Sequence, residues 1–491
     1  MAEDQQAYRQ IFKATSIFGG VQVFNILIAI IKSKVIAVLL GPAGMGIQGL
    51  LTSTTGLIAG LTNFGLGTSA VKNVAEANGK GDAHRIAVVV SVLRKLVWIT
   101  GLLGMVATVA LSPWLSELTF GNRDYTLAFI WISISLLFNQ ISSGQLVILQ
   151  GLRKIKYLAN ANLTGAVLGL VFSLPFYFFW GMDGIVPAII ATSFVSMIRA
   201  WYFARKVAVE KVPVTPAIVK TEGKEMLRMG FMLSLSGLIT VAASYAIRIY
   251  ISNTGGVDDV GLYSAGFAII GTYVGMIFTA MGTDYYPRLS AIASDNMKAK
   301  ELINQQAVIA ILIIAPILTI FIVFIHWMII LLYSTKFSAV DGMVLWAALG
   351  MFFKAASWSI AFIFLAKGVS GLFFWNELST NIYVLAFNVL GYKYGGLDGL
   401  GLSFLVGYFV YLIQVFIVTK IKYQFSFNTA FLKIFLIQLA LSIACFLVVK
   451  FTASPVNYIV GSGLIIISGL YSLRELNRRM DLRGIVRKQR K

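Results

Sequence analysis

The chain consists largely of apolar runs of about 20 residues that are separated by short polar segments. A run of this length crosses the hydrocarbon core of a bilayer as an α-helix. Only 12% of the 491 residues are charged, whereas a soluble domain usually carries about 25%. Because a barrel would show short alternating segments instead, the sequence predicts an all-α polytopic membrane protein with about fourteen helices.

The limits of the apolar runs give fourteen spans and place both ends of the chain on one side of the membrane. The predicted spans are 14–40, 46–71, 86–111, 125–149, 158–180, 184–205, 228–251, 260–287, 303–332, 341–366, 370–391, 398–420, 431–450 and 456–473.

Basic residues in the short loops predict the orientation. Of the Lys and Arg residues in the loops, at the span ends and in the terminal segments, 29 fall on the side of the termini and 4 on the other side. Cytoplasmic loops carry the excess of Lys and Arg. We therefore expect a bacterial inner (cytoplasmic) membrane protein with both termini in the cytoplasm, and the loop placement of the charge argues against nucleic-acid binding.

An internal repeat organises the chain, because similar short motifs recur in its second half at a nearly constant offset. The matched motifs are Lys34, Gly41 and Gly46 with Arg248, Gly255 and Gly261; Gly67-Thr68 with Gly282-Thr283; and Gly181-Met-Asp-Gly184 with Gly396-Leu-Asp-Gly399. Each repeat holds six helices, so both halves have the same polarity, as in parallel-repeat transporters with a central cavity.

The repeat predicts three parts. Residues 1–210 form an N-terminal six-helix lobe, and residues 211–425 form a C-terminal six-helix lobe. Residues 426–491 add two transmembrane helices and a basic cytoplasmic tail.

Charged side chains at membrane depth are costly and mark candidate functional sites. Away from the span ends, the basic residues within the predicted spans are Lys32, Lys34, Arg94, Lys95, Arg199, Arg248 and Lys354. Arg94, Lys95 and Arg199 lie near the cytoplasmic ends, where snorkelling explains them.

Lys354 is the sharpest candidate, because it follows Asp341 by thirteen residues and so lies about 20 Å along its helix. Lys34 and Arg248 are matched in the repeat and lie in the outer halves of their helices, against the positive-inside bias. Snorkelling to outer headgroups is the alternative for this pair. Lys32 lies about 200° around the helix from Lys34 and is a weaker candidate.

Acidic and histidine candidates are few. Glu377 could pair with Lys354 or Lys367, and an i,i+4 pair with Arg288 explains Asp284. His326 fits a hydrogen-bonded interface residue better than a proton carrier. The excess of buried cations over anions predicts an anionic substrate, for which phosphate or pyrophosphate is suited.

With these residues in view, the chain resembles the Wzx-type flippases of lipid-linked oligosaccharides (O-antigen or lipid III) in the multidrug/oligosaccharidyl-lipid/polysaccharide exporter superfamily. The resemblance covers residues 10 to about 425 and rests on three stretches. These are K-V-I-A-V-L-L-G-P-A-G-M-G from Lys34, F-G-N-R-D-Y at 120–125, and L-L-Y-S-T-K-F-S-A-V-D-G-M-V-L-W-A-A-L-G-M-F-F-K at 331–354 with Glu377 beyond it.

The resemblance implies export of an undecaprenyl-diphosphate-linked glycan, with Lys34, Arg248, Lys354 and Lys32 holding the diphosphate. It also implies partners among glycan assembly proteins, such as a polymerase and a chain-length regulator. In this family an acidic residue often follows the glycine before the lysine, but Met351 stands there, so Glu377 becomes the expected partner of Lys354.

Two other functions remain open. A multidrug or small-metabolite exporter of the same superfamily would need an acidic, aromatic cavity, which is the opposite charge balance. A membrane glycosyltransferase or polymerase would need a sizeable outer loop or a catalytic carboxylate segment. The single cysteine excludes a thiolate metal cluster, and two histidines are too few for a histidine-based metal site. The sequence contains no nucleotide-binding loop of the G-x-x-x-x-G-K-[ST] type. We therefore expect no metal, no cofactor and no enzymatic activity.

Overall fold

The computed structural model describes residues 24–480 except 208 and 211. Arg9 and Lys13, which contribute to the predicted cytoplasmic charge, and the tail after Met480 lie outside the described residues. The chain divides into two compact units, Met1–Gly261 and Leu262–Lys491, and each is described by itself.

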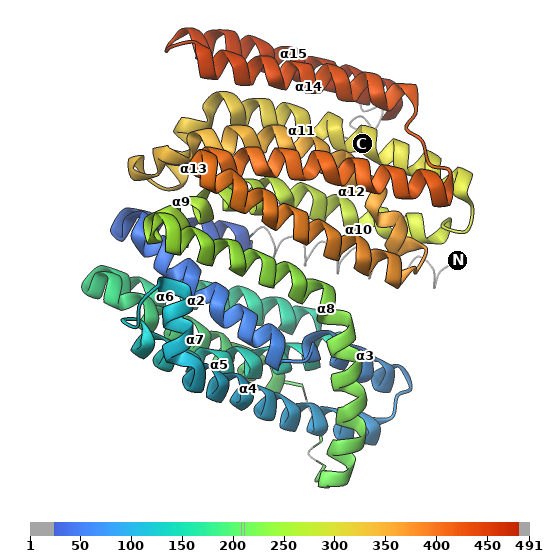
Figure 1. Cartoon of the computed structure of the whole chain (residues 1–491). Helices are drawn as coiled ribbons and strands as arrows, with labels where there is room; N and C mark the ends of the chain where they lie inside the picture. The colour runs from blue at the N-terminus through green and yellow to red at the C-terminus, as the bar shows by residue number, and fades with distance from the viewer. Residues whose placement is uncertain (1–23, 208, 211, 481–491) are drawn as a thin grey trace, which may run out of the picture. The chain divides into compact units, whose positions relative to one another are not determined.

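The first unit begins with helical residues 24–39 and ends in the first residues of α9 (Figure 1). Its helices are α2 (Gly41–Thr62), α3 (Leu66–Gly79), α4 (Ala83–Phe120), α5 (Thr126–Gly151), α6 (Ile155–Trp180), the 3₁₀ turn η1 (Gly181–Gly184), α7 (Ile185–Arg205) and α8 (Pro216–Gly255). Helix α8 packs against α2, α3 and α4. Helix α8, the first helix of the second repeat, therefore belongs to the first unit. The lobe boundary after residue 210, which follows the sequence repeat, stays a prediction.

The second unit continues α9 and ends with two helices beyond the repeat. Its elements are α9 (Val257–Ala268), the π-helix η2 (Ile269–Val274), α10 (Gly275–Ala291), α11 (Asn296–Leu332), the 3₁₀ turn η3 (Thr335–Val340), α12 (Asp341–Ala366), α13 (Ser370–Tyr423), α14 (Thr429–Phe451) and α15 (Val456–Met480).

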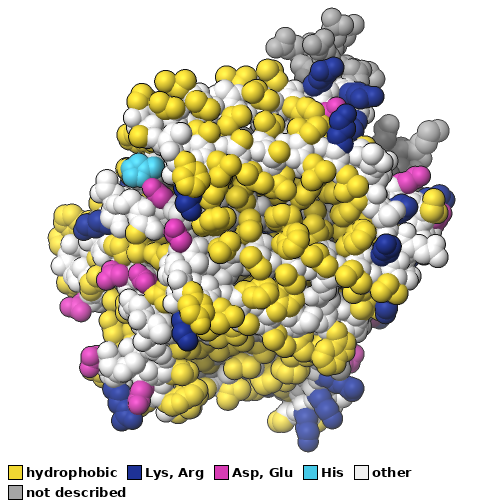
Figure 2. All heavy atoms as spheres, turned by 45° about the horizontal axis from the view of Figure 1, so that its top comes forward, with side chains coloured by type: hydrophobic (Ala, Val, Ile, Leu, Met, Phe, Trp, Pro, Cys, Tyr) yellow, Lys and Arg dark blue, Asp and Glu magenta, His cyan; other side chains and the backbone are white. Residues whose placement is uncertain are grey.

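The prediction of an all-α polytopic membrane protein is confirmed. Nine segments of the described chain are long and apolar enough to cross a membrane. Two of them, 155–205 and 371–423, each contain two helices separated by a glycine turn. Residues 24–39, α2 and α8 complete the fourteen predicted crossings. On the face drawn in Figure 2, hydrophobic side chains cover most of the surface and charged side chains gather toward its margins.

Backbone conformation supports the internal repeat. Gly181 and Gly396, which are matched in the repeat, have φ/ψ of 56°/−126° and 54°/−137° at the turn between two helices. Arg153 and Gly368 are separated by the same offset and have φ of 54° and 68°. Such positive φ values are rare outside glycine, so their recurrence at one offset reflects two copies of the same chain path.

The structure corrects one matched pair of the predicted repeat, Gly41 with Gly255. The turn glycine that corresponds to Gly41 (φ 69°) is Gly256 (φ 93°), because Gly255 is still the last residue of α8. Gly41 and Gly256 are therefore separated by the same number of residues as Gly181 and Gly396. With this separation, the position equivalent to Lys34 is the residue directly after Arg248. The predicted span 46–71 also differs, since it is divided into α2 and α3 at Gly65 (φ 65°).

The last two helices pair through buried polar side chains. The Gln438 amide of α14 donates to the Ser472 hydroxyl at 2.8 Å, and the Ser468 hydroxyl donates to the Gln438 carbonyl at 2.7 Å. All three side chains are buried. Both helices also pack against α11, where a side chain at Gly461 would lie 2.7 Å from Val323.

Candidate functional site

Lys354 lies half-buried on α12 among aromatic rings of the second unit. Its Nζ is 5.1 Å from the ring centroid of Tyr408, 5.8 Å from that of Phe404 and 5.9 Å from that of Phe278. Aromatic faces at these distances attract an ammonium group. They stabilise the charge of Lys354 without neutralising it, so the lysine can still attract an anion.

Gly350, one turn before Lys354, allows this arrangement. A Cβ atom at Gly350 would lie 2.7 Å from the ring of Phe404 and 2.9 Å from the Cα of Leu405. The missing side chain lets α13 approach α12 closely enough to place Phe404 beside the lysine. The pattern that positions the site is therefore a glycine and a lysine on one face of α12.

The other predicted phosphate ligands lie in the first unit. Lys32 and Lys34 are half-buried on the helix of residues 24–39, and Arg248 is half-buried on α8. The Arg248 guanidinium donates to the Ser244 hydroxyl at 3.0 Å. These three residues and Lys354 belong to different units, so their joint binding of one ligand stays a prediction.

Glu377 is half-buried on α13. Within the described residues, no ion pair joins Glu377 to Lys354 or to Lys367. Lys367 instead donates to the backbone oxygen of Ala293 and, at 2.8 Å, to the side-chain oxygen of Asn296. The charge of Lys354 is thus not balanced by Glu377, the carboxylate partner that the sequence suggested.

The remaining predicted residues have structural partners. His326 Nδ1 lies 2.8 Å from Asp341 Oδ2, which joins α11 to the start of α12. Asp284 pairs with Arg288 at 3.1 Å, and both side chains are exposed. These contacts agree with the interpretations of His326 as a hydrogen-bonded residue and of Asp284 as half of an i,i+4 pair.

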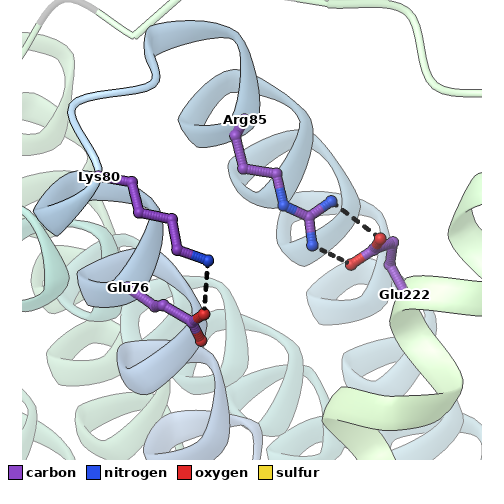
Figure 3. Close-up of polar contacts among 4 residues, drawn as sticks. All are labelled: Glu76, Lys80, Arg85 and Glu222. Atoms are coloured by element: carbon purple, nitrogen blue, oxygen red, sulfur yellow. Dashed lines mark hydrogen bonds and ion pairs between the residues drawn. The ribbon is translucent and has the colours of Figure 1, made fainter.

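Arg85 and Glu222 form an ion pair between the beginnings of α4 and α8 (Figure 3). Two hydrogen bonds of 2.8 and 2.7 Å join the guanidinium to both carboxylate oxygens. The hydrogen bonds from Arg85 lower the pKa of Glu222 below its ordinary value. This fork geometry fixes direction as well as distance. The neighbouring pair joins Glu76, in the last turn of α3, to Lys80, the residue that follows the helix (Figure 3).

Further contacts hold the beginning of α8 and its preceding segment on the first unit. The Lys95 ammonium donates to the backbone oxygen of Val214 at 2.8 Å, which gives this predicted snorkelling residue a fixed partner. Met226 is buried in the hydrophobic core formed mainly by α3, α4 and α5. The segment between the two repeats is therefore attached to the N-terminal helices.

Sequence reasoning missed the aromatic rings around Lys354, the Arg85–Glu222 pair and the partnership of His326 with Asp341. The first two join residues that are far apart in the chain, as in the 137-residue separation of Arg85 from Glu222. Only the fifteen-residue spacing of His326 and Asp341, across a short turn between antiparallel helices, offered a local signal.

The described residues contain no group of three His, Cys, Asp or Glu side chains that could hold a metal ion. The sole cysteine of the chain, Cys445, is buried and free. The chemistry of the described site is therefore that of an ammonium group among aromatic rings.

Comparisons with known proteins agree with this fold. The Lipid III flippase of Escherichia coli (strain K12) is 20% identical over 390 residues, which cover 78% of this chain and 91% of that protein. A solved structure of the lipid II flippase MurJ in an inward closed conformation covers 95% of this chain and 99% of its own, with a TM-score of 0.70 and 12% identity. An inward-facing multidrug resistance transporter of the MATE family covers 82% of this chain and 94% of its own, with a TM-score of 0.66 and 17% identity.

The sequence profile of one protein family matches more than half of the chain. That family is described as "Polysaccharide biosynthesis protein", and the match extends over residues 11–293. The matched region includes the whole first repeat and the turn glycine Gly256 that begins the second. The chain therefore belongs to this polysaccharide biosynthesis protein family.

Proposed function

We propose that this protein is a flippase of lipid-linked oligosaccharides. It moves an undecaprenyl-diphosphate-linked glycan, such as an O-antigen repeat unit, from the cytoplasmic to the periplasmic leaflet by alternating access. The family membership and the likeness to the lipid III flippase over 91% of its length support this proposal. The protein acts in the bacterial inner membrane as a transporter rather than an enzyme, with both termini in the cytoplasm.

The setting of Lys354 is the structural observation that carries the proposal. Its ammonium group is half-buried on a membrane-spanning helix and is surrounded by three rings instead of a carboxylate. An unbalanced charge at this depth is unfavourable until an anion arrives. A diphosphate supplies that anion, and Lys34, Arg248 and Lys32 are the further ligands that we propose.

The proposal is tested by transport in reconstituted vesicles. Protein in liposomes loaded with a fluorescent, undecaprenyl-diphosphate-linked oligosaccharide should make the glycan accessible to an externally added glycosidase. Lys354→Gln should abolish this access, whereas Lys393→Gln, which changes an exposed lysine near the glycine turn within α13, should retain it. Equal rates for wild type, Lys354→Gln and protein-free liposomes would reject the flippase proposal.

The alternative is a multidrug or small-metabolite exporter, because the MATE transporter has the same fold. Such an exporter of cations would use carboxylates at its binding site, but Lys354 brings a positive charge. A cationic dye that is exported by wild-type cells and retained after deletion of the gene would favour this alternative.

A further inference from the structure

A pocket of about 300 Å³ opens between α4, α5 and α7 of the first unit. It is lined by Arg94 and Trp98 of α4, Gly144 and Gln145 of α5, and Trp201 and Arg205 of α7. A Cβ atom at Gly144 would lie 2.6 Å from Val97, so the missing side chain lets α5 and α4 approach closely behind the two arginines. The pocket therefore depends on the packing of three helices, and its two positive charges come from different helices.

The two guanidinium groups have no acidic partner within the described chain. Arg94 is half-buried and makes no hydrogen bond or ion pair to any described residue, and the Arg205 guanidinium stacks 4.0 Å above the ring of Trp201. Two like charges that line one pocket repel each other, and the half-buried Arg94 also loses hydration. A phosphate monoanion or diester between them would relieve both costs, because guanidinium groups bind phosphate oxygens in a bidentate fork.

The pocket lies toward the predicted cytoplasmic ends of α4 and α7. Arg205 is the last residue of α7, and Arg94 lies eleven residues after the start of α4, about 17 Å along it. Trp98 and Trp201 are 52% and 44% exposed at the pocket mouth. Tryptophan prefers the interface between acyl chains and headgroups, so the mouth faces the bilayer interface.

An apolar track continues from the pocket toward the other end of the helices. On α4, the exposed side chains of Leu102 and Val106 follow Arg94 and Trp98 at intervals of four residues, so all four lie on one face. A second hollow, of about 560 Å³, lies between α5, α6 and α7 and is lined by aromatic residues that include Phe138. Free phosphate would leave these surfaces uncovered, whereas the acyl chains of a phospholipid would cover them.

We propose that the Arg94–Arg205 pocket binds one anionic phospholipid of the surrounding bilayer. Its phosphate lies between the two guanidinium groups, its glycerol contacts Gln145 and the two tryptophans, and its acyl chains lie along the apolar face of α4. This lipid is a bound component of the first unit and is distinct from the transported substrate, so the proposal holds whether or not the protein is a flippase.

Native mass spectrometry of the full chain in a mild detergent tests the proposal. Phosphatidylglycerol and phosphatidylcholine with identical acyl chains are titrated separately, and the occupancy of the first bound lipid is compared. Both lipids offer the phosphate diester, but the choline ammonium of phosphatidylcholine would add a third positive charge beside the two guanidinium groups. Wild type should therefore bind the first phosphatidylglycerol about tenfold more tightly. The Arg94→Gln/Arg205→Gln variant should lose this preference, and Arg153→Gln, an exposed arginine of the same unit, should keep it.

Equal binding of the two lipids by wild type, or an unchanged preference in the double variant, would overturn the proposal. Displacement of phosphatidylglycerol by millimolar inorganic phosphate would show that the pocket takes free phosphate and would overturn the lipid assignment. If the double variant does not fold, tryptophan quenching by dibrominated phosphatidylglycerol decides the question. A quenching component that is specific for this lipid should disappear in Trp98→Phe/Trp201→Phe, which retains both arginines, and its persistence would reject the site.

Discussion

Gly46 and Gly261 are equivalent positions of the internal repeat and occupy matching places in a reciprocal close contact. A Cβ atom at Gly46 would lie 1.9 Å from the backbone oxygen of Val257, and one at Gly261 would lie 1.9 Å from that of Pro42. Pro42 and Val257 are themselves repeat-equivalent. The beginnings of α2 and α9 therefore cross with a local two-fold symmetry that only glycine permits at the crossing point.

Replacing either glycine should destabilise this crossing. In Gly46→Ala or Gly261→Ala, the added methyl group must separate the helices, which should cost about 1–3 kcal/mol of unfolding free energy. Gly56→Ala in α2 is the matched control, because nothing lies within 4 Å of its Cβ position. Thermal unfolding in detergent should show a lower midpoint for the first two variants and an equal or higher one for the control. Identical midpoints for Gly46→Ala and Gly56→Ala would contradict the close contact.

If the protein works by the proposed alternating access, we expect this crossing to open during transport. Cysteines at Pro42 and Val257, joined by a short bifunctional thiol reagent after Cys445→Ser, should stop glycan translocation. A reagent with a cleavable spacer should restore it on cleavage, and each single cysteine should be insensitive. Full transport with a quantitative crosslink would rule out opening at this position.

The proposed diphosphate clamp predicts a common phenotype for residues from both repeats. Lys34→Ala, Arg248→Ala and Lys354→Ala should each lower glycan export by at least about tenfold, since one charge-assisted contact contributes about 1.5–3 kcal/mol. Export is measured by complementation of a deletion strain at native expression, with membrane levels compared by immunoblot. Full complementation by all three variants would disprove the clamp.

The Arg85–Glu222 pair predicts a reciprocal rescue. Arg85→Glu and Glu222→Arg should each lower the thermal stability of the protein in detergent, and the double exchange should recover most of it. The pair is partly exposed, so the loss should be about 1 kcal/mol or less from the attraction itself.

The same pair predicts a pH dependence. Since the Glu222 pKa is lowered, the stabilisation is present above the ordinary carboxyl pKa of about 4.3 and is lost as the pH falls through the lowered value. The stability difference between wild type and Glu222→Gln should therefore shrink at acidic pH. A difference that does not change with pH would show that the ion pair is not its source.

Transport of a diphosphate diester should respond to the membrane potential. Two negative charges carried outward from an inside-negative compartment gain about 4–5 kcal/mol per 100 mV, or about a thousandfold in equilibrium ratio. Valinomycin with a potassium gradient, at fixed pH and without sodium, should change the rate in vesicles. A rate that responds only to a proton or sodium gradient would instead implicate Glu377, Asp284 or His326 in coupling.

The fold was predictable from the sequence because its main determinants are local or periodic. Apolar runs define the spans, and turn motifs at a fixed offset reveal the repeat. We predicted the matching turn at Gly255, one residue too early. Gly255 and Gly256 are adjacent glycines that a sequence comparison cannot distinguish, and only the positive φ of Gly256 identifies it as the turn residue. The break between α2 and α3 was also missed, since apolar character continues across it while φ at Gly65 changes sign.

The site was predictable only in part. The depth of Lys354 followed from counting residues along a helix, but its ring neighbours come from α10 and α13. The expected pairing with Glu377 rested on the sequence alone, and the described ion pairs do not include it. Which helices face each other depends on tertiary packing, which a single sequence does not encode in any short pattern.

The buried contacts of Gln438 with Ser468 and Ser472 bear on how the chain enters the bilayer during synthesis. An amide exposed to hydrocarbon has no water to replace its hydrogen bonds. Helix α14 alone would meet lipid with that amide unsatisfied, whereas α14 and α15 together conceal it. The translocation machinery should therefore release these two helices into the membrane as a preassembled hairpin, whose docking on α11 is a separate, later event.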